Sequence, residues 1–228
     1  VAGMREGDDK RSPWPYRVDY RSGEGRGVVS SDMAYILRLF DSLSQHGYTE
    51  FSNPRQKLWE WIVNYQIPNL RQGGMLWTQF FEDYELPHNR NAWAPLNLAR
   101  YLLEKKDKID PDWREHTKAL IEFVEKNFTT VRDGVIVCGE QDNDKNPCGG
   151  VLSNYGGVMT MYAAAVGSDD YKRIAHEALN YGMYAIDDDG CPSQRVDSGR
   201  RGGWQEDAHT DVIHNFMDAI TAFPEWAE

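Results

Sequence analysis

Acidic side chains recur in three polar loops of this chain, each shortly before a stretch with helical periodicity. Glu82 and Asp83 lie in the first loop, Glu140 in the second and Asp207 in the third. Cleavage of a glycosidic bond requires two carboxyl groups across a cleft. One is protonated and donates to the leaving oxygen, and the other is ionised and acts as base or nucleophile. We therefore predict these four residues as a catalytic acidic set.

Aromatic and polar side chains in or near the same loops can supply the rest of a saccharide site. The chain has 8 tryptophans and 12 tyrosines, whose flat apolar faces suit sugar rings. The predicted substrate-binding residues are Trp77, Trp93, Trp204, His209, Arg17 and Gln141. A structural interpretation stands beside this one, because an acidic residue such as Asp207 just before a helix also serves as a cap.

The elements that must position these loops are helices in a repeated order: a first helix, a second helix and then a polar loop. First helices are predicted to begin near Ser30, Asn89, Ser153 and Glu206, and second helices near Asn53, Asp110 and Ser168. The repeat is roughly 55–65 residues long, more than in the common short solenoids. Loops that follow second helices emerge at one end of such a stack, so their residues are expected to converge on one rim.

The periodicity of apolar residues and the residues typical of helix starts together support the predicted helices. In the second helix from Asp110, one buried stripe is predicted from apolar and threonine positions at helical spacing, namely Trp113, Thr117, Leu120, Ile121, Val124 and Phe128. Asn53-Pro54 and Asp110-Pro111 each place a side-chain acceptor before a proline, as at a helix start. Trp59 and Trp61 are expected in the core. Short strands are indicated only from Gly134 and from Gly74.

These features predict an all-α fold, an (α/α) toroid-like stack of helical hairpins that is either incomplete or open, with long polar loops on one rim. The chain has 228 residues, of which 40% are hydrophobic, and no linker-like tract divides it, so we expect a single domain over 1–228.

Composition excludes several classes of function. A net charge of −11 disfavours nucleic acid, and no apolar run approaches the roughly 20 residues of a membrane span. The N-terminus has no apolar signal-peptide segment.

No Cys and His residues have the spacing of a zinc site, and Pro147 interrupts an EF-hand-like run from Asp142. We predict no metal and no cofactor. Cys138 and Cys148 bracket one loop and can close a small ring in an oxidising compartment.

The layout resembles the (α/α)-toroid, six-hairpin glycosidase-like proteins, including secreted bacterial members. The segments that carry the resemblance are WPYRVDY with GEG before SSDMAYILRLFDSL, FFEDYEL before NAWAPLNLARYLL, and GEQ before SNYGGVMTMYAAAV. The resemblance implies a saccharide-sized cleft, glycoside hydrolase activity on an oligosaccharide or polysaccharide, and a secreted or periplasmic location. A closed toroid at this repeat length needs roughly 350 residues. The chain is therefore expected to be the C-terminal part of a longer toroid, or an open arc.

Two alternatives remain open at the level of sequence. A polysaccharide lyase acting on uronates needs a base and a group that neutralises the uronate. The residues available for these roles are Tyr16, Tyr155, His209, Arg17 and Arg200. The other alternative is a non-catalytic carbohydrate-binding or scaffold domain, in which the loop carboxylates point away from one another.

Overall fold

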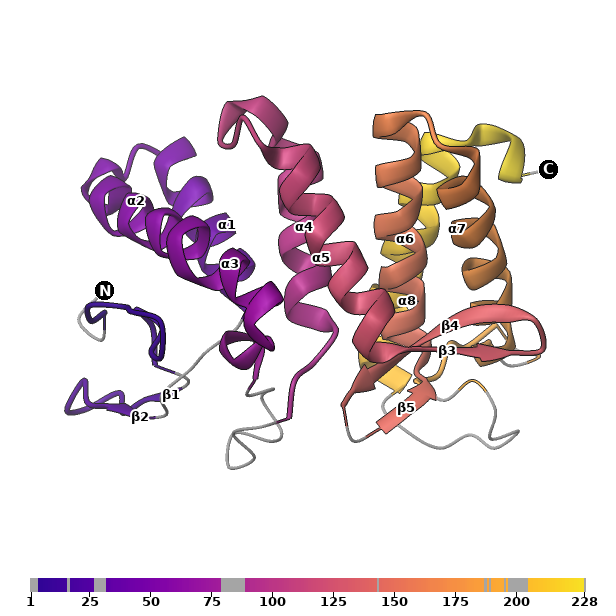
Figure 1. Cartoon of the computed structure of the whole chain (residues 1–228), viewed down its shortest axis with the longest axis horizontal. Helices are drawn as coiled ribbons and strands as arrows, with labels where there is room; N and C mark the ends of the chain where they lie inside the picture. The colour runs from indigo at the N-terminus through magenta and orange to yellow at the C-terminus, as the bar shows by residue number, and fades with distance from the viewer. Residues whose placement is uncertain are drawn as a thin grey trace. The chain divides into compact units, whose positions relative to one another are not determined.

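The computed structural model describes residues 4–15, 17–26, 32–78, 89–142, 144–186, 188, 190–194, 196 and 205–227, with the backbone alone for 205–209. Two compact units divide the chain, Val1–Leu98 and Ala99–Glu228. Figure 1 shows the elements of both units. The single domain expected over 1–228 remains a prediction.

Unit 1 contains a short hairpin and a series of helices. Its elements are β1 (Arg17–Val18), β2 (Gly25–Arg26), α1 (Met33–Gln45), α2 (Ser52–Trp61) and α3 (Ile67–Asn69), and β1 pairs antiparallel with β2. A π-helical turn at Ile62–Gln66 joins α2 to α3, and 3-10 turns occupy Thr49–Phe51, Leu70–Gln72 and Met75–Trp77.

The core of unit 1 forms where α1 and α2 pack together. Leu37 of α1 and Leu58 of α2 are fully buried. The ring of Phe40 lies 6.0 Å from the rings of both Trp14 and Phe51. Trp61 is 4% exposed and donates its indole N–H to the Asp8 carbonyl oxygen at 3.0 Å, which fastens the N-terminal segment to α2.

Unit 2 is built from longer helices and a small sheet. Helix α4 (Trp93–Lys105) runs across the boundary between the units, and its C-terminal part belongs to unit 2. The other elements are α5 (Trp113–Phe128), β3 (Thr129–Arg132), β4 (Val135–Gln141), β5 (Asp144–Pro147), α6 (Gly149–Val166), α7 (Asp169–Gly182) and α8 (Gln205–Ala222), with 3-10 turns at Lys106–Lys108, Met183–Ala185 and Pro224–Ala227.

Helix α6 is the centre of unit 2, with α7 and α8 packed against it (Figure 1). Its glycines allow both approaches. A Cβ on Gly156 would lie 2.7 Å from Leu179 Cγ of α7, and a Cβ on Gly157 would lie 2.4 Å from Asn215 Oδ1 of α8. The close packing on two faces of this helix explains why glycine occupies both positions.

The sheet of unit 2 has the antiparallel order β3-β4-β5. Asp133 and Gly134 both have positive φ, 51° and 83°, as a two-residue type I′ hairpin turn requires between β3 and β4. Glu140 and Gln141 stand at the end of β4, so the sheet carries them toward the start of α6.

Most predicted helices are confirmed, and their boundaries differ in informative ways. The whole predicted stripe of α5 is buried, and Ser168 caps α7 by accepting from the Tyr171 N–H at 3.4 Å. Asn53 is not a cap, because α2 begins at Ser52 after a 3-10 turn. Asp110 precedes the first helical residue by three positions, and its carboxylate accepts from the Asp112 N–H at 3.0 Å.

The strand indicated from Gly134 is confirmed as β4, whereas the segment from Gly74 begins as the 3-10 turn Met75–Trp77 rather than a strand. The chain is mostly helical, and the three-stranded sheet is an addition that an all-α class does not contain. Among the helices that the structure describes, none has the length and apolarity to cross a membrane.

Candidate functional site

The N-terminal ends of α6 and α8 lie at the same end of unit 2. Asp211 lies over Gly150, since a Cβ there would be 3.1 Å from Asp211 Oδ2, and Asn215 lies over Gly157 further along. Both residue numbers increase in the same direction, so the two helices run parallel (Figure 1). The loops that lead into α6 and α8 therefore end on one side of this unit.

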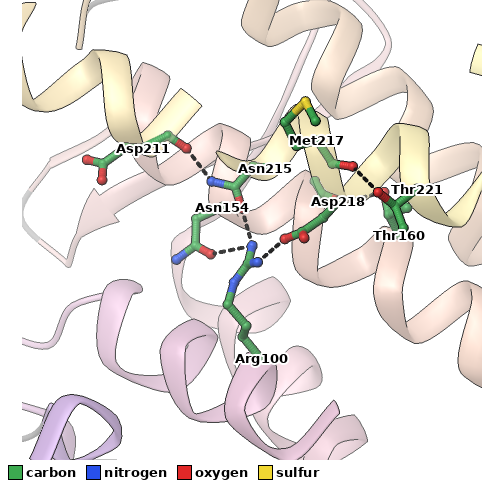
Figure 2. A network of polar contacts seen from close by, with 9 residues as sticks. Arg100, Asn154, Thr160, Asp211, Asn215, Met217, Asp218 and Thr221 are labelled. Atoms are coloured by element: carbon green, nitrogen blue, oxygen red, sulfur yellow. Dashed lines mark hydrogen bonds and ion pairs between the residues drawn. The ribbon is translucent and has the colours of Figure 1, made fainter. Parts of the chain in front are cut away.

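A buried polar seam joins α6, α8 and the C-terminal part of α4 (Figure 2). The guanidinium of Arg100 forms an ion pair with Asp218 and donates to the side-chain oxygens of Asn215 and of Asn154, the last at 3.5 Å. Asn215 in turn donates through its side-chain nitrogen to the backbone carbonyl of Asp211.

Because the seam is buried, its polar contacts matter for the stability of unit 2. Arg100 is 6% exposed, and Asn154 and Asn215 are 2% exposed. A charge removed from water is tolerated only when it is paired and hydrogen-bonded, and three side-chain acceptors surround the Arg100 guanidinium. Because the contacts come from three helices, the seam fixes the position of α8 against α6.

A second polar cluster lies at the start of α6. The side-chain oxygen of Gln194 accepts from the Gly150 N–H at 2.9 Å and from the Cys148 thiol at 3.1 Å, and the Gln194 carbonyl accepts from the Gly149 N–H at 2.8 Å. A residue distant in sequence thus satisfies backbone groups that every helix leaves unpaired at its N-terminus.

Two carboxylates from different elements approach this cluster. Burial of the thiol, followed by the charges of Glu140 and Asp211, raises the pKa of Cys148 to about 12. Glu140 comes from β4 and Asp211 from α8, and both are half-buried. Asp211 lies over Gly150, and Gly139, next to Glu140, pairs with Pro147, next to Cys148, so acidic groups of the second and third loops converge at the start of α6. We call Glu140, Cys148, Gln194 and Asp211 the rim cluster.

Tyr155 of α6 lies in the interior, where its hydroxyl donates to Glu125 Oε1 at 3.2 Å. The side chain is fully buried. Burial, and then the charge of Glu125, raises the pKa of Tyr155. A phenolate is the form that removes a proton, so this environment makes Tyr155 a poor general base at neutral pH.

The structure places the predicted site residues in very different surroundings. Glu140 lies in the rim cluster, and Gln141 beside it is 9% exposed. In unit 1, Trp77 is fully buried and donates its indole N–H to the Gln66 carbonyl at 3.0 Å. Its ring therefore packs in the core, with no face open to a sugar. Arg17 is exposed on β1, and Trp93 is half-buried at the start of α4.

The remaining predicted residues lie outside the described part of the chain. They are Glu82, Asp83, Trp204, Tyr16 and Arg200, together with the side chains of Asp207 and His209. The backbone of Asp207 belongs to α8, one turn before Asp211.

Sequence reasoning missed the seam and most of the rim cluster. Asp211, Asn215 and Asp218 recur at i, i+4 and i+7 on α8, and Gly150, Asn154 and Gly157 recur at the same spacing on α6. Matching polar and small-residue stripes on two helices were the available signal. Nothing local pointed to Arg100.

Cys138, Cys148 and Cys191 are free thiols, so the ring that Cys138 and Cys148 can close is open in this structure. Among the described residues, no group of three or more His, Cys, Asp or Glu side chains has the arrangement of a metal site.

Comparison of the chain with models of protein families, with curated proteins and with solved structures gave no match. The site is therefore interpreted from its own geometry, and the resemblance to six-hairpin glycosidases remains a prediction from the sequence.

Proposed function

We propose that this protein is a secreted or periplasmic, glycoside hydrolase-like protein with a toroid-like arrangement of hairpins, and that it binds an oligosaccharide at the end of unit 2 where α6 and α8 begin. Glu140 and Asp211 act there as the acidic pair. Asp207, one helical turn before Asp211, belongs to the same acidic end of α8.

The observation that carries the proposal is geometric: Asp211 of α8 lies over Gly150 at the start of α6, and the pairing of Gly139 with Pro147 brings the neighbouring Glu140 to the same end. Two acidic groups on a common rim are what acid–base cleavage of a glycosidic bond uses. The seam supports this role, because Asn215 holds the Asp211 carbonyl while Arg100 holds Asn215.

The surroundings of Tyr155 disfavour a lyase that uses this residue as its base. A lyase acting on a uronate needs a base and a cation beside the substrate carboxylate. Of the residues considered for the base, Tyr155 is buried and its pKa is raised.

The test is a screen of neutral and uronic oligosaccharides with detection of new reducing ends, using wild type, Glu140→Gln and Asp211→Asn. The amides keep the shape of the acids but cannot exchange a proton at neutral pH. We expect turnover of a neutral substrate to fall by about 100-fold or more in at least one variant, a common size for loss of acid–base catalysis, with saccharide binding largely retained.

Glu122→Gln is the matched control, because Glu122 is exposed on α5 and pairs only loosely with Lys118 at 3.6 Å. It should leave turnover unchanged. Absence of turnover on every neutral substrate, with saccharide binding unaffected by both amide variants, would overturn the acidic-pair proposal and favour a binding or scaffold protein.

A further inference from the structure

A cavity of about 700 Å³ opens on unit 2 between the tip of the β3–β4 hairpin and the C-terminal end of α7. Its lining includes Asp133, Val135, Glu177, Asn180, Tyr181 and Tyr184. Small-molecule sites usually enclose about 300–1,000 Å³, so this volume is large enough for a ligand of several rings. We call it the tyrosine groove.

The tyrosine groove extends from the hairpin tip toward the rim cluster, because Val196, two residues after Gln194, also lines it. Val135 lines the groove at the start of β4, and Glu140 lies five residues further along the same strand. At about 3.3 Å per residue, an extended strand places these two positions roughly 17 Å apart.

Two aromatic rings give the groove its apolar surface. The rings of Tyr181 and Tyr184 have centroids 5.6 Å apart and an interplanar angle of 77°. Tyr184 is 75% exposed, so most of its ring surface faces water. The edge-to-face arrangement holds the two rings at different orientations, which supplies apolar faces in two directions.

Polar groups frame these rings. The Asp133 carboxylate is held at a hairpin tip whose two residues adopt the backbone of a tight type I′ turn. Glu177 is oriented by Arg173, whose guanidinium nitrogen lies 3.0 Å from each carboxylate oxygen. Asn180 is placed one turn after His176, to which its side-chain nitrogen donates at 3.2 Å.

We infer that the tyrosine groove binds a neutral oligosaccharide through residues other than the acidic pair Glu140 and Asp211. Apolar ring faces take the C–H faces of a sugar, while carboxylate and amide oxygens accept hydrogen bonds from its hydroxyl groups. The exposed Asp133 carboxylate repels phosphates, sulfates and uronates, whereas the charge of Glu177 is paired with Arg173. The inference does not require cleavage at Glu140 and Asp211.

The experiment measures migration of the full chain in native gels cast with a neutral glucan, a neutral xylan or a neutral mannan, and with polygalacturonate for comparison. Tyr184→Ala removes the exposed ring, and Tyr184→Phe keeps the ring while removing the hydroxyl. Tyr20→Ala is the control, because Tyr20 is an exposed tyrosine of unit 1 at 83% exposure. Circular dichroism of each variant checks that the fold is kept.

We expect at least one neutral polysaccharide to retard the wild type. Tyr184→Ala should weaken that binding at least tenfold, whereas Tyr184→Phe should retain most of it and Tyr20→Ala all of it. The double variant Glu140→Gln/Asp211→Asn should keep the Tyr184-dependent retardation, so failure of the proposed catalysis is distinguishable from failure of the groove. No retardation by any neutral polysaccharide, equal retardation of wild type and Tyr184→Ala, or stronger binding to polygalacturonate would each overturn the inference.

Discussion

Replacing Asp32 with asparagine should change how the stability of unit 1 depends on pH. The Asp32 carboxyl group lies at the start of α1, where Oδ2 accepts from the Asn97 side chain at 3.0 Å and Oδ1 is buried without a hydrogen-bond partner in the described structure. Burial raises the pKa of Asp32 from 3.8 to about 7, against the opposing effects of the Asn97 hydrogen bond and the Arg38 charge.

The magnitude and sign follow from linkage between protonation and folding. A pKa roughly three units above its ordinary value corresponds to about 4 kcal/mol. Between pH 4 and pH 7 the folded state binds more protons at Asp32 than the unfolded state. Stability from this group is therefore fully present below about pH 4, falls as the pH rises, and reaches its lowest level above about pH 7.

Asp32→Asn removes the titrating group and keeps an oxygen that can accept from Asn97. The new side-chain nitrogen takes the place of buried Oδ1, and an unpaired buried donor costs about 1–3 kcal/mol. At pH 8 this cost is smaller than that of an ionised carboxylate. The variant should therefore be more stable than wild type by about 1–3 kcal/mol at pH 8, and less stable at pH 4.5.

Urea unfolding at pH 4.5, 6 and 8 measures this effect. Tryptophan fluorescence suits the assay because Trp59, Trp61 and Trp77 are all buried in unit 1. Glu50→Gln, at an exposed position, should leave the wild-type pH dependence unchanged. The reasoning is refuted if wild type and Asp32→Asn lose the same stability between pH 4.5 and pH 8.

Three further predictions concern unit 2. Gly157→Ala should destabilise the fold by about 1–3 kcal/mol in thermal or urea unfolding, because the new Cβ meets the polar seam. Gly182→Ala, whose Cβ meets nothing closer than 3.6 Å, should change stability by less than about 1 kcal/mol. Asp218→Asn should lower the free energy of unfolding by about 3 kcal/mol, because the buried Arg100 charge loses its ion-pair partner. The double variant Arg100→Met/Asp218→Leu should recover much of that loss. A thiol titration of the native protein should show one fast cysteine, Cys191, because burial raises the pKa of the other two thiols.

Helices that have a local sequence signal could be predicted from the sequence. The apolar stripe of α5 repeats at helical spacing, and every member of it is buried. The start of α7 could be predicted near Ser168, and the structure shows that Ser168 caps this helix. Asn53 carried a similar signal, but the 3-10 turn before it moved the start of α2 to Ser52.

Residues whose role depends on tertiary contacts could not be assigned from the sequence. Trp77 stands in a polar, glycine-rich stretch typical of a surface loop. Its ring is nevertheless fully buried, and its indole N–H donates to the Gln66 carbonyl. Gln194 follows a proline-containing loop with no motif, yet its oxygens accept hydrogen bonds from the backbone N–H groups at the start of α6. In each case the deciding partner is set by the fold and leaves no local pattern.

The seam explains why the rim cluster depends on residues far from the start of α6. An apolar contact between two helices tolerates a shift along their axes, whereas a buried guanidinium does not, because each lost acceptor leaves part of its charge unpaired. Arg100 can keep Asp218 and Asn215 only if α8 lies in one register against Gly157. That register sets Asp211 over Gly150 at the start of α6, where Glu140 arrives from β4. The polar contacts in the middle of the helices therefore determine the position of the carboxylate at their ends.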